Sequence, residues 1–443
     1  MSTTPTSAQL FERACRVLPG GNSRTTVFLE PHPIYAACGS GCRITDVDGN
    51  TRIDFLNNYT SLLHGHAHPV IIEAVRAQLD RGTCFPMPTE SEILLAELLC
   101  ERIPSVDRIR FTNSGTEAVM MALKAARAYT GRPLIAKCEG CYHGAYDFAE
   151  VSQESTDDDW GSLERPRSVA PALGTPTAVL DNVIVIPFNV PAVAEQLLLQ
   201  HADSIAAVLV DPMPNRAGLM SATPEFLQVL RRFTSRHRSI LIFDEVITFR
   251  LGYHGAQNEF GVIPDLTALG KVIGGGFPVG AVGGRADVMA VFDPRGGKPL
   301  VPHGGTFNAN PITMTAGLAA MHLMTLEAYG ALNALGDALR SDLTGLFAEV
   351  GVDVQVAGRG SLLKFHMHGR PLSDYRSGVP SAAEARAMAD FHRALLSAGI
   401  VISPDGLCAL STVMTSSEVD SMVASVREAY DSLSARVPAR AHS

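Results

Sequence analysis

Short apolar runs alternate with longer amphipathic stretches between residues 105 and 290. The short runs have the length of buried strands, and the longer stretches repeat apolar residues at the three- and four-residue spacing of one helix face. Strands that alternate with helices predict a mostly parallel sheet with helices on both faces. The strand candidates are residues 108–111, 133–139, 182–188, 205–212, 239–246 and 281–284.

The clearest helix prediction follows the first of these strands. Its apolar positions are Ala118, Met121, Ala122, Ala125 and Ala128. Gly131 and Pro133 are typical of a helix end, and a second helix is predicted over residues 224–237. Because parallel sheets bind ligands beyond the carboxyl ends of their strands, residues that directly follow these strands are the first candidates for a site.

The flanking segments differ from this centre. The sequence DGN at 48–50, between alternating apolar positions, predicts a hairpin. After residue 315 come long helical patterns, two strands near 352–358 and 361–369, and a last helix that starts near Ser417. We therefore expect a large domain over 61–315 and a smaller α+β domain built from residues 1–60 and 316–443.

Composition limits the class of protein. The 443 residues are 46% hydrophobic and 18% charged, which is ordinary for a folded enzyme. The formal charge of −9 leaves no basic stripe for nucleic acid. No apolar stretch of membrane-spanning length occurs, and the start of the chain lacks the pattern of a secretory signal. We expect a cytoplasmic protein that binds neither nucleic acid nor membranes.

The cysteines and histidines do not predict a metal site. The close pairs Cys38 with Cys42 and Cys138 with Cys141 lie about a hundred residues apart and lack the spacing of a zinc site. The run HGHAHP at 64–69 alternates histidines on one face of an extended segment, but no acidic or thiol partner stands nearby in the sequence. We interpret it as a loop packed at the domain junction.

Three stretches carry the chemistry. In TNSGTEA, at 112–118, a strand gives way to a helix, and the backbone N–H groups of Ser114, Gly115 and Thr116 are suited to a phosphate. Simple helix capping by Ser or Thr is the common alternative for such a pattern. In LIFDEVITFR, at 241–250, an apolar strand ends in two carboxylates, which need a cationic partner such as a protonated ring nitrogen.

The third stretch is LTALGKVIGGGFPVGAVGG, at 266–284. Lys271 follows an apolar strand and precedes a glycine run, so burial should lower its pKa and favour the neutral amine that attacks a carbonyl. The glycines would let the backbone pass close to a planar ligand. A surface lysine beside a flexible turn is the alternative for this stretch taken alone. Phosphate cradle, carboxylate and lysine together are the three groups that hold pyridoxal 5′-phosphate (PLP).

The segments NSGTEAVMMALKAARAYTGR, EGCYHG, LIFDEV, PDLTALGKVIGGGFPVGAVGGRADVM and GGTFNANPITM resemble those of class III, or subgroup II, PLP-dependent aminotransferases. The resemblance spans about residues 15–430 and implies an α/β fold, PLP-dependent transferase fold type I. Within that family the chain is most similar to the glutamate-1-semialdehyde aminomutase branch, which includes β-amino-acid aminotransferases of the β-phenylalanine type.

The resemblance implies the following roles. Lys271 is the Schiff-base lysine and proton carrier, and Asp244 is the partner of the pyridine nitrogen. Ser114, Gly115 and Thr116 hold the phosphate, Tyr142 stacks on one ring face, Val246 packs under the other, and His143 orders the loop. Thr306 reaches the phosphate of a neighbouring subunit, which implies a homodimer with shared active sites. Arg24 binds the substrate carboxylate.

Departures from the family pattern concern the substrate. Asp211 stands where the family usually has glutamate, and Leu407 and Cys408 stand where aminomutases place an acidic residue. Some β-phenylalanine aminotransferases have arginine where this chain has Asp405, so binding of a second carboxylate stays open. We therefore expect ping-pong transfer of an amino group from an amino acid to a 2-oxo acid. The alternatives are an aminomutase-type isomerase and a silent PLP-binding protein.

Overall fold

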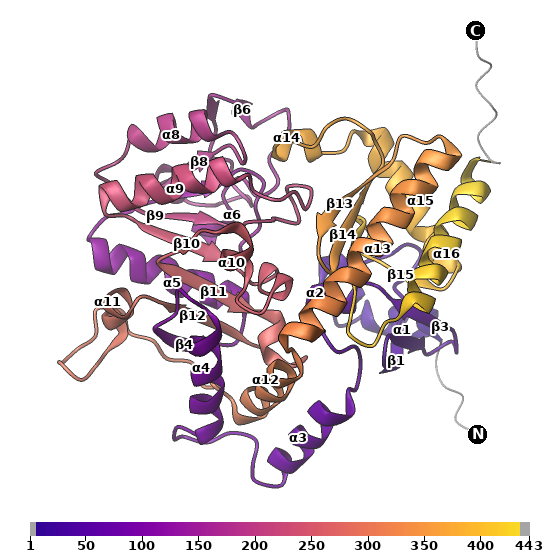
Figure 1. The fold of residues 1–443 in the computed structure, drawn as a ribbon, viewed down its shortest axis with the longest axis horizontal. Coiled ribbons are helices and arrows are strands. Elements are labelled where there is room, and N and C mark those ends of the chain that lie inside the picture. Colours follow the sequence, from indigo (N-terminus) through magenta and orange to yellow (C-terminus); the bar gives the residue numbers. More distant parts are fainter. Residues whose placement is uncertain (1–5, 435–443) are drawn as a thin grey trace.

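The computed structural model describes residues 6–434, with side chains through residue 431. A seven-stranded sheet forms its centre (Figure 1). β12 runs antiparallel to both neighbours and the other six strands are mutually parallel, which confirms the predicted mostly parallel sheet. The strand order is β4 (Arg108–Thr112), β12 (Gly280–Gly284), β11 (Leu266–Gly270), β10 (Ile240–Asp244), β9 (Ile205–Val210), β5 (Leu134–Cys138) and β8 (Val183–Ile186).

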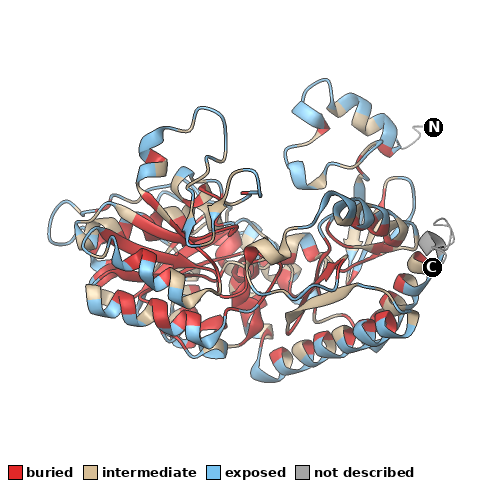
Figure 2. Cartoon of the chain, turned by 90° about the horizontal axis from the view of Figure 1, so that it is seen from above, coloured by how far each residue is buried: buried red, intermediate tan, exposed pale blue. Residues whose placement is uncertain are grey.

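Helices cover both faces of this sheet. Along β10, Ile240 and Ile242 pack in one hydrophobic cluster with α5 (Gly115–Thr130), whereas Leu241 and Phe243 pack in another with α9 (Pro224–His237) and α8 (Pro191–Leu199). The alternation follows from the two-residue period of a strand. Figure 2 shows the strands of this sheet buried along most of their length.

The predicted helix after β4 is confirmed as α5. Ser114 caps its N-terminus by accepting a hydrogen bond from the Glu117 backbone N–H at 3.2 Å. At the other end, Gly131 adopts φ +69°, the left-handed conformation that ends a helix with least strain in glycine.

Two small sheets lie beside the large one, and the first of them contains strands from both ends of the chain. β3 pairs in parallel with β15, and Ile53 lies opposite Ile400. Figure 1 shows α1 (Ser7–Ala14) and α16 (Ser416–Ser434), the first and last described helices, on this side of the molecule. The first sheet contains β1 (Ala36–Ser40), β2 (Arg43–Asp46), β3 (Thr51–Asp54) and β15 (Ile400–Val401), and the second contains β13 (Gln355–Arg359), β14 (Leu362–His366) and β16 (Leu407–Ala409). The helices beside them include α13 (Leu326–Val350), α15 (Ala382–Ser397) and α16 (Ser416–Ser434).

One hydrophobic cluster runs through the junction between the large and small parts. It includes Leu95 of α4 (Glu90–Arg102), Met321 of α12 (Pro311–Leu323) and Leu339 of α13, together with Ile53. Because this core is shared, the boundaries at 60 and 315 stay predictions. Residues 1–5 and 435–443, which belong to the predicted outer segments, lie outside the described residues.

The predicted hairpin and histidine loop are both present. β2 and β3 pair antiparallel around the 47–50 turn, where Gly49 has φ +89°. His64 contacts Thr412 Oγ1 and the Ala320 carbonyl, each at 2.9 Å, and His66 Nε2 lies 2.8 Å from Asp54. These contacts join distant parts of the chain and agree with a loop packed at the junction.

The other elements are short connections or outer helices. No helix within residues 6–434 is long and apolar enough to cross a membrane. The short connections and outer helices are α1 (Ser7–Ala14), α2 (Asn57–Thr60), α3 (Pro69–Leu79), α6 (Asp147–Glu150), β6 (Gly161–Ser162), β7 (Arg165–Pro166), α7 (Thr177–Asp181), α10 (Ala256–Phe260), α11 (Ala286–Met289) and α14 (Tyr375–Gly378).

Candidate functional site

A cavity of about 360 Å³ opens at the carboxyl edge of the large sheet. The loops that follow β4, β5, β9, β10 and β11 all reach it, as does the segment that leads into β12. This is the edge where parallel sheets bind ligands. The lining residues are Asn58, Ser61, Asn113, Ser114, Gly115, Thr116, Tyr142, His143, Gly144, Asp211, Asp244, Val246, Ile247, Lys271, Gly276, Phe277, Pro278 and Val279.

Lys271 is the first residue after β11 and lines the cavity. Burial lowers the pKa of its ammonium to about 8, although the carboxylates of Asp244 and Asp211 act in the opposite direction. A substantial fraction of the side chain is therefore a neutral amine near pH 8, which is the nucleophilic form. The structure thus agrees with the lowered pKa expected from the sequence.

The glycine run after Lys271 serves packing more than the cavity. A Cβ at Gly275 would lie 2.3 Å from the Ala316 carbonyl oxygen, and a Cβ at Gly317 would lie 2.1 Å from the Ile273 carbonyl oxygen. The absence of a Cβ at these two glycines lets the short turn of residues 271–274 pack closely against α12. Gly276 alone of the run lines the cavity. The expectation that these glycines lie beside a planar ligand therefore applies to one of them.

Asp244 ends β10 and is 4% exposed. Its Oδ1 accepts a hydrogen bond from the Val246 backbone N–H at 3.0 Å, and its Oδ2 lies 2.7 Å from His143 Nδ1. The two contacts fix the carboxylate in the cavity wall. It can hold a cationic ring nitrogen that enters beside Lys271.

His143 has a closer connection to the site than the sequence indicated. It is 1% exposed, and its Nε2 has no hydrogen-bond partner among the described residues. Burial would lower the pKa of the imidazole, but contacts with Asp244 and with the Cys141 thiol raise it overall. Because His143 and Asp244 are 101 positions apart, only the folded chain reveals that they form a pair.

The residues of the predicted phosphate cradle lie at the start of α5, and their binding of phosphate stays a prediction. Ser114, Gly115 and Thr116 all line the cavity. Backbone N–H groups in the first turn of a helix have no carbonyl partner within the helix and favour an anion. Ser114 also caps the helix, so the two interpretations of this motif are compatible. Thr116 Oγ1 accepts a hydrogen bond from the Ala145 backbone N–H at 3.1 Å, which ties the cradle to the loop after β5.

Tyr142 and Val246 contribute to the walls of the same cavity. A Cβ at Gly115 would lie 2.9 Å from Val246 Cγ1, so glycine at this position lets the phosphate cradle approach that wall closely. The Arg216 guanidinium lies 4.9 Å from the centre of the Tyr142 ring. The two predicted faces for a planar ring are therefore in place, while their roles stay predictions.

Asp211 is the cavity carboxylate to which the sequence gave no role. It follows β9 just as Asp244 ends the neighbouring β10, and it is 4% exposed. Burial, together with the negative charge of Asp244, raises its pKa well above the ordinary value for aspartate. A protonated Asp211 can donate a hydrogen bond inside the cavity. The common signal of both residues is an acid at the end of a fully apolar strand.

Arg24 lies at the rim rather than in the wall. Its Nη1 donates to Asn58 Oδ1 at 2.9 Å, and Asn58 lines the cavity. The guanidinium also lies 5.9 Å from the centre of the Tyr59 ring. Both partners are uncharged, so the positive charge of Arg24 is available to a carboxylate at the rim.

Thr306 lies apart from this cavity. It is exposed and lines a second cavity of about 240 Å³, together with residues 84–89 and Glu92. Within one chain Thr306 does not meet the cradle of Ser114, Gly115 and Thr116. Its predicted role across a subunit interface stays a prediction.

The structure also places the two residues that stand where aminomutases have an acidic side chain. Leu407 and Cys408 lie in β16, where both are at most 1% exposed. Both side chains belong to the small sheet, and neither one offers a carboxylate to the cavity. Within the described residues no group of His, Cys, Asp and Glu side chains could hold a metal ion, and Cys138 and Cys141 are free thiols.

The cavity fits PLP. It has an anion cradle for the phosphate, a buried carboxylate for the ring nitrogen and an amine for the aldehyde, all on one edge of one sheet. The imidazole of His143, which also lines the cavity, supports that carboxylate through its 2.7 Å contact with Asp244.

Comparisons with known proteins place these features in context. Residues 29–428 match the family described as Aminotransferase class-III. The structure superposes with a TM-score of 0.95 on that of an omega-transaminase from Sphaerobacter thermophilus, with 56% sequence identity over 97% of this chain and 98% of the other. The sequence is 42% identical to the beta-phenylalanine transaminase of Variovorax paradoxus over 95% of this chain and 92% of that protein. It is 39% identical to a glutamate-1-semialdehyde 2,1-aminomutase of Methanothermobacter thermautotrophicus, over 96% and 99% respectively.

Proposed function

Because the chain belongs to the class-III aminotransferase family and is a PLP-dependent transaminase, we propose that it moves the amino group of a β-amino acid to a 2-oxo acid in two half-reactions. The observation that carries the choice of substrate is Arg24. It is a guanidinium with uncharged partners, tied through Asn58 to the cavity that contains Lys271. The 42% identity to a beta-phenylalanine transaminase supports the same substrate class.

The chain's own residues have distinct tasks in this proposal. PLP, when bound, carries the amino group and withdraws electrons from the carbon that loses a proton. Lys271 Nζ would hold the cofactor through its aldehyde carbon, with the aldehyde oxygen leaving as water, and once the substrate amine displaced it the freed amine would carry that proton. Asp244 keeps a proton on the ring nitrogen, and the first turn of α5 binds the phosphate. Tyr142 and Val246 orient the ring between them.

The pKa of Lys271 suits proton transfer in both directions. A group that must both accept and release a proton works best when its pKa lies near the working pH. Burial places the pKa of Lys271 at about 8, so Nζ can do both near neutrality. Arg24 meanwhile fixes the substrate carboxylate, because its planar fork can bind both carboxylate oxygens.

A donor panel tests the proposal. We expect a β-amino acid to convert the cofactor from its aldehyde to its amine form, with pyruvate or 2-oxoglutarate restoring the aldehyde. Arg24→Ala should raise KM for the β-amino acid by about tenfold or more and leave a simple amine without a carboxylate unaffected. Arg24→Lys is the matched control that keeps the charge and loses the fork.

Three outcomes would contradict this proposal in whole or in part. Conversion of glutamate semialdehyde without any external acceptor would identify the aminomutase reaction instead. Slow half-reactions with every amine would identify a silent PLP-binding protein. Equal kinetic effects of Arg24→Ala on the amine and the β-amino acid would remove Arg24 from substrate binding.

The proposal includes a second copy of the chain and a cytoplasmic location. Thr306 and Phe307 are exposed on one loop, beside the exposed Phe85 and Met87. This apolar surface supports a homodimer in which Thr306 reaches the partner's phosphate. Mixing Lys271→Ala with Thr306→Arg chains should restore activity through hybrid dimers, whereas two inactive parents that stay inactive together would contradict sharing. The free thiols of the chain support a reducing compartment, which fractionation of cells would test.

A further inference from the structure

Three cations contact segments that form the cavity, and their partners differ. Arg24 contacts the uncharged Asn58 and Tyr59. Arg216, over the Tyr142 ring, forms an ion pair with Glu154. The third cation is Lys364 of β14, whose Nζ lies 2.7 Å from Asp405 Oδ2. Two of the three positive charges are therefore already matched by carboxylates of the chain.

Asp405 lies between two segments that form the cavity. Asn215 Nδ2 donates to its Oδ2 at 3.4 Å, and Asn215 belongs to the loop that begins with Asp211. On the other side, the negative charge of Asp405 helps burial to raise the pKa of Tyr59, the neighbour of Asn58. The Asp405 side chain is 49% exposed and lies outside the cavity lining, so a ligand that extends from the cavity past these two segments can approach it.

The Asp405 carboxylate is fixed in its ionised form. Besides Lys364, it accepts a hydrogen bond from Ser403 Oγ. Burial alone would raise the pKa of Asp405, but the Lys364 ammonium and the hydrogen bonds from Lys364, Ser403 and Asn215 hold it well below its usual range. Lys364 in turn donates to the Asn215 carbonyl at 3.1 Å. Because Lys364 is paired with Asp405, its ammonium is not free to bind a ligand.

The Arg216 pair is built differently. The Glu154 side chain is 70% exposed and that of Arg216 is 30% exposed. Exposed ion pairs contribute little, so a ligand could displace Glu154 more readily than Asp405. Arg216 is therefore the alternative source of a second carboxylate site, and any test has to separate it from Asp405.

We propose that Asp405 determines the acceptor, restricting it to 2-oxo acids with one carboxylate. This inference rests on the proposed function, in which Arg24 binds the carboxylate of each substrate in turn. Because Asp405 already holds the Lys364 ammonium, a second carboxylate on the acceptor would meet a carboxylate there and no unpaired cation, which disfavours the ligand. Asp405 is thus a specificity-determining residue that acts by pairing with Lys364 and by its like charge.

The experiment compares pyruvate with 2-oxoglutarate as acceptors for the amine form of the holoenzyme. We expect kcat/KM to favour pyruvate by at least about tenfold. Asp405→Asn should raise kcat/KM for 2-oxoglutarate by about fivefold or more and change that for pyruvate little, because it removes the repulsion and frees the Lys364 charge. Glu154→Gln is the matched control, a carboxylate-to-amide change at the other ion pair of the entrance, and should leave the acceptor ratio unchanged.

Each result decides between the ideas. A wild-type preference for 2-oxoglutarate would overturn the inference, even if Asp405→Asn failed to fold. A ratio that shifts with Glu154→Gln and stays constant with Asp405→Asn would assign the selection to Arg216 and also overturn it. Failure of every 2-oxo acid to restore the aldehyde form would instead contradict the proposed function.

Discussion

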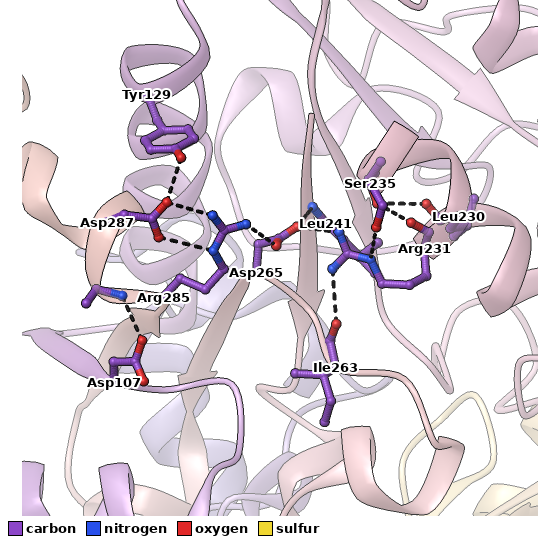
Figure 3. A network of polar contacts seen from close by, with 12 residues as sticks. Asp107, Tyr129, Leu230, Arg231, Ser235, Leu241, Ile263, Asp265, Arg285 and Asp287 are labelled. Atoms are coloured by element: carbon purple, nitrogen blue, oxygen red, sulfur yellow. Dashed lines mark hydrogen bonds and ion pairs between the residues drawn. The ribbon is translucent and has the colours of Figure 1, made fainter. Parts of the chain in front are cut away.

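Both edges of the large sheet contain carboxylate and cationic side chains, but the way in which these charges are paired differs between the two edges. At the amino edge, Asp265 precedes β11 and accepts hydrogen bonds from the Leu241 backbone N–H at 2.8 Å, from Arg231 at 2.9 Å and from Arg285 at 2.8 Å (Figure 3). At the carboxyl edge, Asp244 also belongs to these central strands, but it shares a cavity with Lys271.

The difference lies in how charge is matched. At the amino edge Asp265 pairs with the guanidinium groups of Arg231 and Arg285, and Arg285 also pairs with Asp287 at 2.6 Å. At the carboxyl edge, burial raises the pKa of Asp211 and lowers that of Lys271 to about 8. Matched charges hold a structure together, whereas groups with strongly shifted pKa values in a cavity mark a site of chemistry. In this sheet, the amino edge therefore contributes to stability and the carboxyl edge to function.

The largest effect should follow from removing Lys271. Lys271→Ala deletes both the amine that binds the aldehyde and the carrier of the proton, and proton transfer alone contributes about 10²- to 10⁴-fold to rate. We expect turnover to fall by at least this factor, while unfolding stays cooperative. Steady-state kinetics, with mass spectrometry after hydride reduction of the holoenzyme, provide the measurement.

The control for this change is Lys298→Ala, which removes an exposed lysine that does not line the cavity. It should keep normal turnover. Cofactor mass recovered on a residue other than 271 in the wild type would contradict the assignment.

The amino edge should respond in stability instead. Asp265→Asn leaves two guanidinium groups without their shared carboxylate, and breaking a buried pair is costly. Because the Arg285 side chain is 45% exposed, solvent screening reduces the loss, and we expect about 2–3 kcal/mol in the free energy of unfolding. Denaturant unfolding measures it, and kcat of the folded variant should be unchanged.

Asp287→Asn is the matched control at the same edge. It removes a carboxylate from the same arginine, but the Asp287 side chain is 50% exposed. The loss should stay within about 1 kcal/mol. Equal losses for the two variants would show that burial does not distinguish these pairs.

The sequence predicts the sheet and α5 because these depend on local periodicity. Buried strands and an amphipathic helix leave their period in consecutive residues, whereas the Asp265 cluster leaves none. Arg231 and Arg285 stand 34 and 20 positions from Asp265, and nothing in the chain marks them as partners. The antiparallel direction of β12 is likewise set by the turn after Lys271 and by packing against β4.

The candidate site was predictable where a motif combines strand end and chemistry. Lys271 and Asp244 both follow that rule and both line the cavity. Asp211 obeys the same rule, but its role depends on which strands are neighbours, which β9 and β10 become only in the folded sheet. The hydrogen bond between His143 and Asp244 is a contact between distant segments, so the sequence could indicate only that His143 stands beside Tyr142.

The third prediction reverses the usual sign of a substitution. In cofactor-free protein, burial of the Lys271 ammonium costs stability, because its folded pKa of about 8 lies below the ordinary 10.5. The cost is fully present below pH 8, decreases between the two pKa values and vanishes above 10.5. Lys271→Met should therefore raise Tm at pH 7, by an amount equivalent to about 1–3 kcal/mol, and this gain should shrink at pH 10. A gain independent of pH would point to packing instead of charge.

The smallest effect should come from substitution of His143, the hydrogen-bond partner of Asp244. His143→Gln removes the imidazole whose Nδ1 lies 2.7 Å from Asp244 Oδ2 and leaves that carboxylate less firmly oriented. One hydrogen bond to a charged group contributes about 1.5–3 kcal/mol, and glutamine can replace part of it, so we expect cofactor binding to weaken by about five- to tenfold. The measurements are PLP titration and the pH dependence of the bound-cofactor spectrum, because a role for His143 in loop packing alone would leave the spectrum unchanged. Cys141→Ser, which replaces the thiol beside the His143 imidazole with a hydroxyl, should alter both readouts less than His143→Gln. If His143→Gln bound PLP as tightly as the wild type, with the same spectrum at each pH, Asp244 would hold its position without help, and the carboxyl edge would depend on fewer paired groups than the contrast with Asp265 implies.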